Sequence, residues 1–141
     1  MPGRDRVEVY GVRFDGAQLS VEVFSPTMLA VRMAGILDGV TLARLAALVQ
    51  TQLDRPGCCG HIVVDLGEVG FFGTDDLAPL LAVGDAARAK GVRLHVAGIS
   101  AREGMVPASI MAAFAQFSSF PTLEKAELAL AGRPTPVGVG G

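Results

Sequence analysis

Residues 61–77 read HIVVDLGEVGFFGTDDL, and this stretch decides the fold. Its first part, 61–66, is short, mostly apolar and rich in β-branched side chains, which is typical of a central strand buried on both faces. Residues 67–76 are expected to form a loop. From Leu77 onward, apolar residues recur at helical spacing as far as Gly91, a natural helix terminator. Strand, loop and helix in this order indicate one unit of an α/β sheet.

The N-terminal side of this stretch predicts a β-hairpin followed by a helix. Partly alternating apolar residues at 19–24 and 28–34 flank a Ser-Pro-Thr turn, which indicates two antiparallel strands. Asp38 is of a residue type preferred at helix N-caps, and the apolar face that follows it, as far as Leu53, predicts a helix. Residues 7–14 add a candidate edge strand.

The C-terminal side continues the alternation. A strand is expected at 92–96 and helices at 106–116 and 122–131, the last with Thr122 as its N-cap. We therefore predict an α/β fold, a small mixed β-sheet covered by helices. In this fold an N-terminal hairpin precedes alternating helices and parallel strands.

The chain divides into three parts. Residues 1–18 are an N-terminal extension or edge strand, 19–131 form the single domain, and 132–141 form a Gly/Pro-rich tail that we expect to be disordered. One domain suits a chain of 141 residues. A hydrophobic content of 50% and a mean hydropathy of +0.45 exclude a chain that is disordered throughout.

The charge distribution excludes nucleic acid as a partner. The net charge is −2, and the cationic residues are scattered singly instead of forming a basic run. No apolar leader precedes the first strand, so a cytoplasmic location is expected. Residues 104–123 carry no charge, but their prolines, Gln116 and hydroxyl side chains argue against a membrane span.

No metal or cofactor is expected. Cys58 and Cys59 are adjacent, an arrangement that strains a disulfide and makes a poor zinc site, so reduced, structural cysteines are predicted. His61 and His95 lie in apolar runs without metal-ligand spacing and are interpreted as strand histidines.

The stretch quoted above resembles the signature of STAS domains, and especially of the bacterial anti-sigma factor antagonists. In that family a strand ending in Asp-Leu leads through an aromatic or apolar pair to Asp-Ser-Ser/Thr-Gly-Leu and a helix. Residues 65–66, 71–72 and 73–77 fall in this register without a gap. The Gly-Ile-Leu-Asp at 35–38 and the segment 89–94 are also similar to the family pattern. The resemblance therefore covers nearly the whole predicted domain.

The resemblance implies a non-enzymatic protein that acts by protein–protein interaction in a partner-switching pathway of transcription regulation. In the family, the unphosphorylated antagonist binds an anti-sigma factor that is also a kinase, and phosphorylation at the loop-to-helix junction abolishes binding. The implied partner is an anti-sigma factor or a histidine-kinase-like regulator, and Thr74 is the candidate phospho-acceptor. The implied partner-binding residues are Asp38, Gly73, Thr74, Asp75, Asp76 and Leu77.

The signature departs from the family pattern where the switch would lie. Gly73 stands in place of Asp, Asp75 in place of Ser or Thr, and Asp76 in place of Gly. Two hypotheses follow: either Thr74 is still phosphorylated, or the fixed carboxylates form a surface without a switch, which the three changes slightly favour. The acidic residues are also ordinary helix caps, with Asp76 the expected N-cap of the next helix and Pro79 in its first turn.

The sequence contains features of two other classes of function. An enzyme is not expected, because no phosphate-binding glycine motif and no Ser-His-Asp order accompanies the loop carboxylates, which are Asp65, Glu68, Asp75 and Asp76. The alternative is a ligand-sensing, lipid-binding or small-molecule-binding module, or a homodimer, because a set of apolar residues could line a groove. At helical spacing such residues more often form a core. The set is Met105, Ile110, Met111, Phe114, Phe117 and Phe120.

Overall fold

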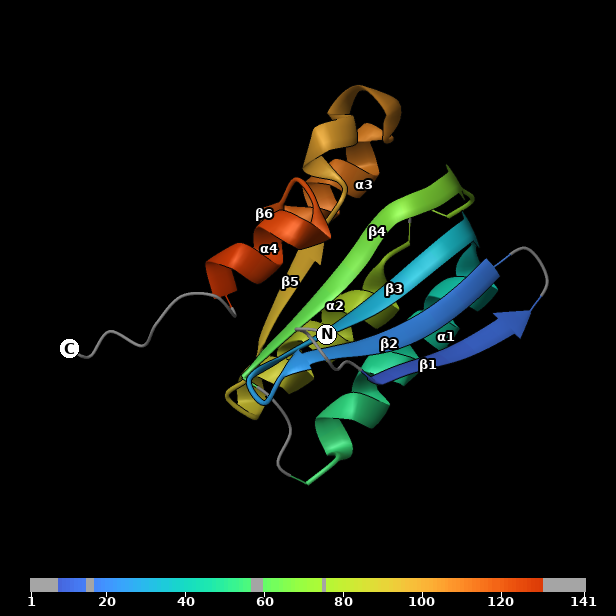
Figure 1. Ribbon diagram of the computed structural model, residues 1–141. Coiled ribbons are helices and arrows are strands. Elements are labelled where there is room, and N and C mark those ends of the chain that lie inside the picture. Colours follow the sequence, from blue (N-terminus) through green and yellow to red (C-terminus); the bar gives the residue numbers. More distant parts are fainter. Residues whose placement is uncertain (1–7, 15–16, 57–59, 75, 131–141) are drawn as a thin grey trace.

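The computed structural model describes residues 8–14, 17–56, 60–74 and 76–130 (Figure 1). The strands are β1 (Glu8–Phe14), β2 (Ala17–Ser25), β3 (Met28–Leu37), β4 (His61–Phe72), β5 (Arg93–Ala97) and β6 (Ser118–Phe120). The helices are α1 (Gly39–Asp54), α2 (Ala78–Ala89), α3 (Ala108–Phe114) and α4 (Leu123–Leu130), with a 3-10 helix, η1 (Ser100–Met105). Cys58, Cys59, Asp75 and the predicted tail lie outside the described residues.

The strands form one mixed sheet in the order β1-β2-β3-β4-β5-β6. The pairs β1–β2 and β2–β3 are antiparallel, whereas β3, β4, β5 and β6 run parallel to one another. The predicted α/β class, a hairpin followed by alternating helices and parallel strands, is thereby confirmed. β1 lies at the edge of the sheet beside β2, while the division of the chain at residues 18 and 131 stays a prediction.

Alternate residues of the sheet face two different helical layers. On β4, Ile62 and Val64 belong to the main core, to which α1, α2 and α3 contribute, whereas Val63 belongs to a smaller cluster that includes Ala126 of α4. Figure 1 shows α1 and α2 behind the sheet and α4 in front of it. Because strand side chains point to opposite faces in turn, each layer receives every second residue of the central strands.

Side chains close in sequence cap two of the helices as predicted. Asp38 accepts a hydrogen bond from the Thr41 backbone N–H at 2.9 Å, and the Thr41 hydroxyl accepts one from the Asp38 N–H at 2.8 Å. This capping box begins α1. At α4, the Thr122 hydroxyl accepts a hydrogen bond from the Lys125 N–H at 3.1 Å. Both N-caps satisfy N–H groups that a helix leaves without partners.

The loop predicted at 67–76 is wrong over its first part, because β4 continues as far as Phe72. Two register shifts against β3 accommodate the extension: Arg32 pairs with Asp65 and Ala34 with Glu68, so β4 holds one extra residue between these pairs. The second shift lies beyond Gly35. Such bulges interrupt the alternation of apolar and polar side chains by which a strand is recognised in a sequence.

The ends of two helices also differ from the prediction. α2 begins at Ala78 with Leu77 as its N-cap, not Asp76, and Pro79 lies in its first turn. α3 is shorter than the predicted 106–116, because the chain leaves the helix to form β6, a strand that the sequence reading missed. A short edge strand with two serines has almost no apolar pattern of its own.

None of the described helices is long and apolar enough to cross a membrane. The uncharged stretch at 104–123 spans the end of η1, all of α3 and β6, and the first residue of α4.

Candidate functional site

The ends of β3 and β4 bring two of the predicted partner-binding residues together. Leu37 lies opposite Phe72 in the parallel pairing, and the Gly73 N–H donates to the Leu37 carbonyl at 2.8 Å. A Cβ placed on Gly73 would lie 3.4 Å from the Cβ of Asp38. Parallel neighbours end at the same edge of a sheet, which is why residues so far apart in sequence meet here.

The side chains of Thr74 and Asp76 serve the backbone before α2. The Thr74 hydroxyl accepts a hydrogen bond from the Asp76 N–H at 3.1 Å, and an Asp76 carboxylate oxygen accepts one from the Ala78 N–H at 3.1 Å. Thr74 is half-buried and Asp76 is exposed. Leu77, at the end of this turn, is buried in the main core and fixes the turn to it. Asp75 lies outside the described residues.

Asp38 is a fixed negative charge beside this turn. Hydrogen bonds from the backbone and the hydroxyl of Thr41 hold the pKa of the Asp38 carboxyl below its ordinary value. An ionised carboxylate at the N-terminus of α1 also interacts favourably with the helix dipole.

Three exposed apolar side chains lie close in the chain to Asp38 and Gly73, and a fourth lies on α4. The large hydrophobic side chains described as exposed are Ile36 at 40%, Val40 at 64%, Phe71 at 62% and Leu128 at 73%. Ile36 and Phe71 are register partners on β3 and β4, and Val40 lies in the first turn of α1. We call Ile36, Asp38, Val40, Phe71, Gly73, Thr74 and Asp76 the loop patch. Sequence reasoning missed Ile36 and Val40, because an apolar residue gives no local sign of being exposed.

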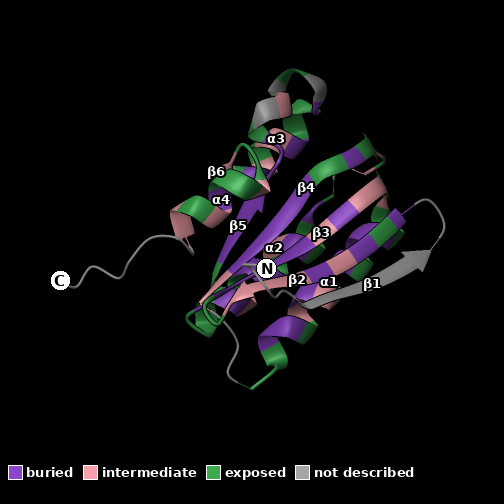
Figure 2. Cartoon of the chain, viewed as in Figure 1, coloured by how far each residue is buried: buried purple, intermediate pink, exposed green. Residues whose placement is uncertain are grey.

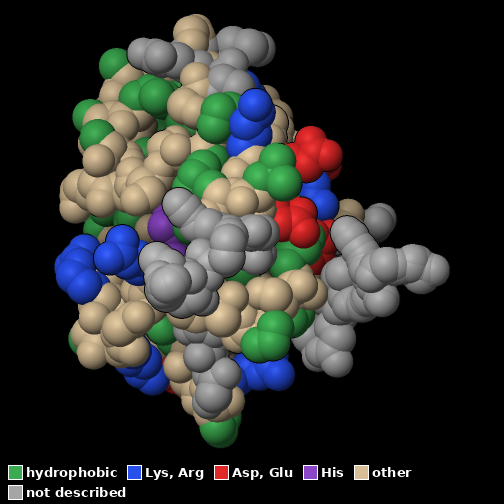
Figure 3. Space-filling view, turned by 60° about the vertical axis from the view of Figure 1, so that its left-hand side comes forward, with side chains coloured by type: hydrophobic (Ala, Val, Ile, Leu, Met, Phe, Trp, Pro, Cys, Tyr) green, Lys and Arg blue, Asp and Glu red, His purple; other side chains and the backbone are tan. Residues whose placement is uncertain are grey.

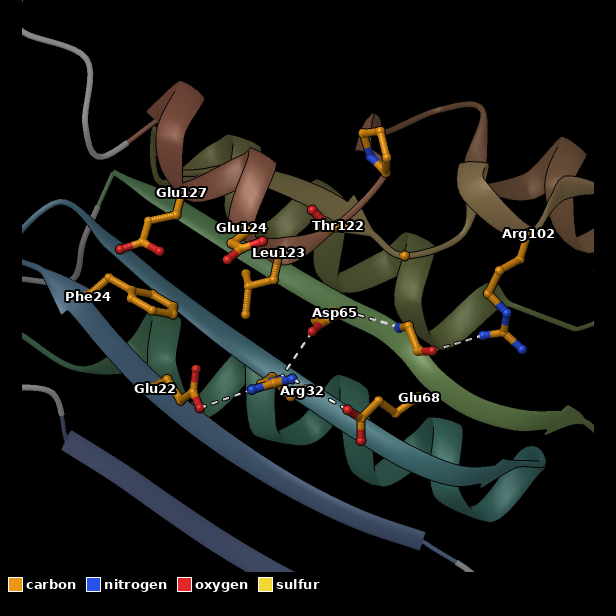
Figure 4. Close-up of a pocket in the computed structure, with 13 residues that line it drawn as sticks. Glu22, Phe24, Arg32, Asp65, Glu68, Arg102, Thr122, Leu123, Glu124 and Glu127 are labelled. Atoms are coloured by element: carbon orange, nitrogen blue, oxygen red, sulfur yellow. Dashed lines mark hydrogen bonds and ion pairs between the residues drawn. The ribbon is translucent and has the colours of Figure 1, made fainter.

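A second polar region lies on the α4 side of the sheet. A cavity of about 490 Å³ opens between the sheet and α4 (Figure 4). Its lining residues are Glu22, Phe24, Arg32, Asp65, Gly67, Glu68, Gly98, Arg102, Pro121, Thr122, Leu123, Glu124 and Glu127. Acidic side chains lie on either side of a basic one on the face seen in Figure 3. None of the loop patch residues lines this cavity.

Arg32 is the centre of an ion-pair network in this cavity. Its guanidinium lies 3.1 Å from Asp65, 3.2 Å from Glu22 and 3.8 Å from Glu68. Burial opposes the charge of Arg32, but the three carboxylates outweigh it and raise the pKa of the guanidinium. Asp65 is therefore engaged in a structural ion pair, and it also accepts a hydrogen bond from the Gly67 N–H at 3.0 Å.

The carboxylates considered for an enzyme do not converge. Asp65 and Glu68 line the cavity, whereas Asp76 lies in the turn before α2. Within the part of the chain that the structure describes, no three His, Cys, Asp or Glu side chains are grouped to hold a metal ion.

The two histidines lie in strands, as interpreted from the sequence. His61 on β4 and His95 on β5 are joined by a 3.1 Å contact between Nδ1 of His61 and Nε2 of His95. His95 is only 4% exposed, and burial followed by the nearby His61 and Arg93 lowers its pKa to about 4. Burial and then Arg93 also lower the pKa of His61.

The apolar set considered for a ligand groove divides between two places. Ile110 and Phe114 are buried in the main core, and Met111 and Phe117 pack against it. Phe120 instead packs against the smaller cluster under α4. The side chain of Met105 lies outside the described residues. The described members therefore do not line one groove, and the interpretation as core is correct for Ile110 and Phe114.

This sheet, with its N-terminal hairpin, parallel later strands and helices on both faces, has the STAS-domain fold. Among solved structures it is similar to the anti-sigma factor antagonist SpoIIAA in its unphosphorylated form, with a TM-score of 0.62 and 14% identity over 83% of this chain and 99% of that one. It is also similar to the Bacillus cell fate determinant SpoIIAA in the phosphorylated form, with a TM-score of 0.56 and 15% identity over 77% and 95% of the two chains.

A third similar structure is an anti-sigma factor antagonist from Mycobacterium paratuberculosis, with a TM-score of 0.52 and 22% identity over 93% of this chain and 99% of that one. No protein-family model and no curated protein matches the amino-acid sequence. The fold implied by the sequence resemblance is confirmed, since a likeness at these identities shows the fold.

Proposed function

We propose that this chain is an anti-sigma factor antagonist-like protein that binds its partner through the loop patch. The proposed partner is an anti-sigma factor or a histidine-kinase-like regulator in a bacterial partner-switching pathway. The observation that carries the proposal is the exposure of Ile36, Val40 and Phe71 around Asp38 and Gly73. Clustered apolar side chains at a surface mark interaction sites, and these surround the residues that the sequence resemblance singled out.

The loop patch has the composition of a small protein interface. Complete burial of one large apolar side chain contributes about 1.5–3 kcal/mol, so Ile36, Val40 and Phe71 supply an apolar centre. Asp38 and Asp76 add negative charge at its rim, which favours a partner with basic residues opposite them. Leu77 and Leu37 lie in the main core and hold the patch from beneath.

The proposal has two versions, one in which Thr74 is phosphorylated and one in which the surface has no switch. A phosphate on Thr74 would add about −1.5 to −2 charge beside Asp76 and Asp38 and would disrupt the turn in which the hydroxyl accepts the Asp76 N–H. In the version without a switch, the Thr74 hydroxyl only satisfies that backbone group, and the carboxylates set the charge of the surface permanently.

Partner capture with a matched control variant tests the proposal. Purified wild type, Phe71→Ser and Leu128→Ser are used as bait for the histidine-kinase-like regulators of the source organism, and affinities are measured by titration calorimetry. Phe71→Ser should weaken binding by about tenfold or more. Leu128→Ser, which removes a large apolar side chain of α4 that is at least as exposed, should not change it. Equal affinities of all three baits would refute binding through the loop patch.

Phosphorylation is decided separately. Incubation of the wild type with the captured regulator and ATP, followed by phosphopeptide mass spectrometry, should detect phosphate on Thr74 if the switch is retained. The version without a switch instead predicts unmodified Thr74 and an unchanged affinity for Thr74→Ala.

The cavity of about 490 Å³ favours a second candidate function, the binding of a small molecule between the sheet and α4. Its volume lies within the range of ligand sites, and its charged lining suits a polar molecule better than a lipid. Native mass spectrometry of the purified protein should then detect a bound small molecule that Leu123→Trp displaces. Spectra that contain the protein alone would count against this candidate.

A further inference from the structure

Among the strands that the structure describes, the second half of β4, residues 66–72, has a neighbour on one side only. β5 pairs with β4 as far as Ala97, which lies opposite Asp65, and no pairing with β5 continues beyond this point. On the other side, β3 still pairs with β4 as far as Leu37. Backbone groups on the β5 side of this half therefore need partners from outside the sheet.

The guanidinium of Arg102, from η1, supplies such partners. Its Nη1 donates to the carbonyl oxygens of Leu66 at 3.1 Å and Gly67 at 3.3 Å, and its Nη2 donates to that of Val69 at 2.6 Å. The guanidinium also lies over the ring of Phe72, 5.9 Å from its centroid. One side chain thus binds three carbonyls of this half, between Leu66 and Val69, on the side where β5 no longer pairs.

The bulges of β4 explain why a side chain fits here better than a strand. The extra residue between the Arg32 and Ala34 pairs lets the consecutive carbonyls of Leu66 and Gly67 bind the same nitrogen of Arg102. A regular strand presents alternate, not consecutive, carbonyls to one side. The planar guanidinium carries five N–H donors and can reach all three oxygens at once.

Two glycines bring η1 close enough for these contacts. Gly98 has a φ of +89°, and a Cβ on it would overlap the backbone of Gly67. The chain leaving β5 therefore crosses directly beside β4 at the first bulge. From η1 the Arg102 side chain reaches β4, and the Arg102 backbone N–H donates to the Ile99 carbonyl at 2.9 Å.

We propose that Arg102 is a positioning residue for the loop patch. It holds the second half of β4 against β3, so that Phe71 is presented beside Ile36 and Gly73 beside Asp38. Phe72 and Gly73 transmit the position, since Phe72 lies under the guanidinium and opposite Leu37, and the Gly73 N–H binds Leu37. This role rests on the proposed function of the loop patch, of which Arg102 itself is not a member.

Hydrogen exchange of the free protein tests this role without a partner. Wild type, Arg102→Met and Arg102→Lys are compared by mass spectrometry over peptides that cover 66–73 and 93–97. Arg102→Met should speed exchange in 66–73 by about tenfold or more and leave 93–97 unchanged. The carbonyls of the first segment lose hydrogen bonds from a charged donor, so this segment opens more readily and its backbone N–H groups exchange faster. Arg102→Lys should lie between the two, since an ammonium keeps the charge but lacks the planar fork.

Arg88→Met is the matched control, because Arg88 is an exposed arginine of α2 that pairs with Asp85. It should exchange like the wild type. Unchanged exchange in 66–73 for Arg102→Met, or an equal rise in every peptide, would overturn the proposal. If Arg102→Met does not fold, Arg102→Lys decides: a rise confined to 66–73 supports the role, and wild-type exchange refutes it.

The affinities of the variants for the captured regulator distinguish a failure of the positioning role of Arg102 from a failure of the proposed function. Arg102→Met should lose affinity by about tenfold, in step with the local rise in exchange. A local rise without a loss of affinity would refute the positioning role. If the proposed function is what fails, Phe71→Ser will keep full affinity.

Discussion

The two halves of β4 differ in what flanks them. Residues 61–65 lie between β3 and β5, and their side chains are largely buried (Figure 2). Residues 66–72 have β3 as their only neighbour among the described strands, and they include exposed positions such as Glu68 and Phe71. The first half builds the core, and the second half carries one side of the loop patch. A strand with neighbours on both sides has the backbone groups of both edges paired, but a strand with one neighbour leaves the groups of one edge available for other contacts.

The largest effect on stability is expected where the first half enters the core. Ile62→Ala should lower the free energy of unfolding by about 2–5 kcal/mol, because Ile62 is fully buried and its truncation leaves a cavity. Ile36→Ala removes the same atoms from an exposed residue opposite the second half and should cost less than about 1 kcal/mol. Urea unfolding of both variants measures the difference, and equal losses would contradict the contrast between the halves.

The next largest effect is expected at Asp65, where the halves meet. Asp65→Asn should cost about 1–3 kcal/mol, because Asp65 is 6% exposed and its charge is paired with Arg32. Asp85→Asn, which breaks the exposed pair with Arg88, serves as the control and should cost less than about 0.5 kcal/mol. Chemical denaturation would contradict this prediction if both variants lost the same stability.

Acid should weaken the sheet where the first half of β4 meets β5, at the contact between His61 and His95. The pKa of His95 is lowered to about 4, so the folded state favours the neutral ring, and stability is full above the unfolded pKa of about 6.5. As the pH falls from 6.5 toward 4.5, the unfolded chain takes up the proton first, and stability should fall by roughly 1–2 kcal/mol. Thermal unfolding over this range should show a flatter profile for His95→Phe. Parallel profiles for the two proteins would contradict the role of His95.

The smallest of these effects is expected at the cap beside the loop patch. Asp38→Ala should cost about 1 kcal/mol, because it removes the capping box of α1. It should also weaken partner binding, since Asp38 belongs to the patch. Asp54→Ala, at the other end of α1, should leave binding unchanged. An unchanged unfolding free energy for Asp38→Ala would show that the cap contributes nothing measurable.

Local signals predicted most of the fold. The N-caps Asp38 and Thr122 were found because a cap binds backbone groups only a few residues away. The buried part of β4 could be predicted because its run of β-branched residues is continuous. Its second half could not, because Gly67 and Gly70 are typical of loops and interrupt the strand pattern. β6 was missed because its strand character comes from pairing with β5.

The candidate site was predicted only in part. Asp38, Gly73 and Thr74 were proposed from the family resemblance, and the structure brings Asp38 and Gly73 together. The exposure of Ile36 could not be predicted, because an apolar residue at the end of a strand has the same local pattern whether a helix covers it or not. The role of Arg102 could not be predicted from nearby sequence, since its carbonyl acceptors lie 33 to 36 positions earlier in the chain.

The sequence by itself determined the order of the elements apart from η1 and β6, the burial of the central strand on both faces, and the caps of α1 and α4. These features depend on side-chain periodicity and on hydrogen bonds between near neighbours in the chain. Only the tertiary structure decided how far β4 extends, which apolar side chains stay exposed, and how Arg32 and Arg102 are engaged. The reason is that parallel pairing and the crossing at Gly98 bring together groups that are distant in sequence, so their contacts are set by the assembled sheet.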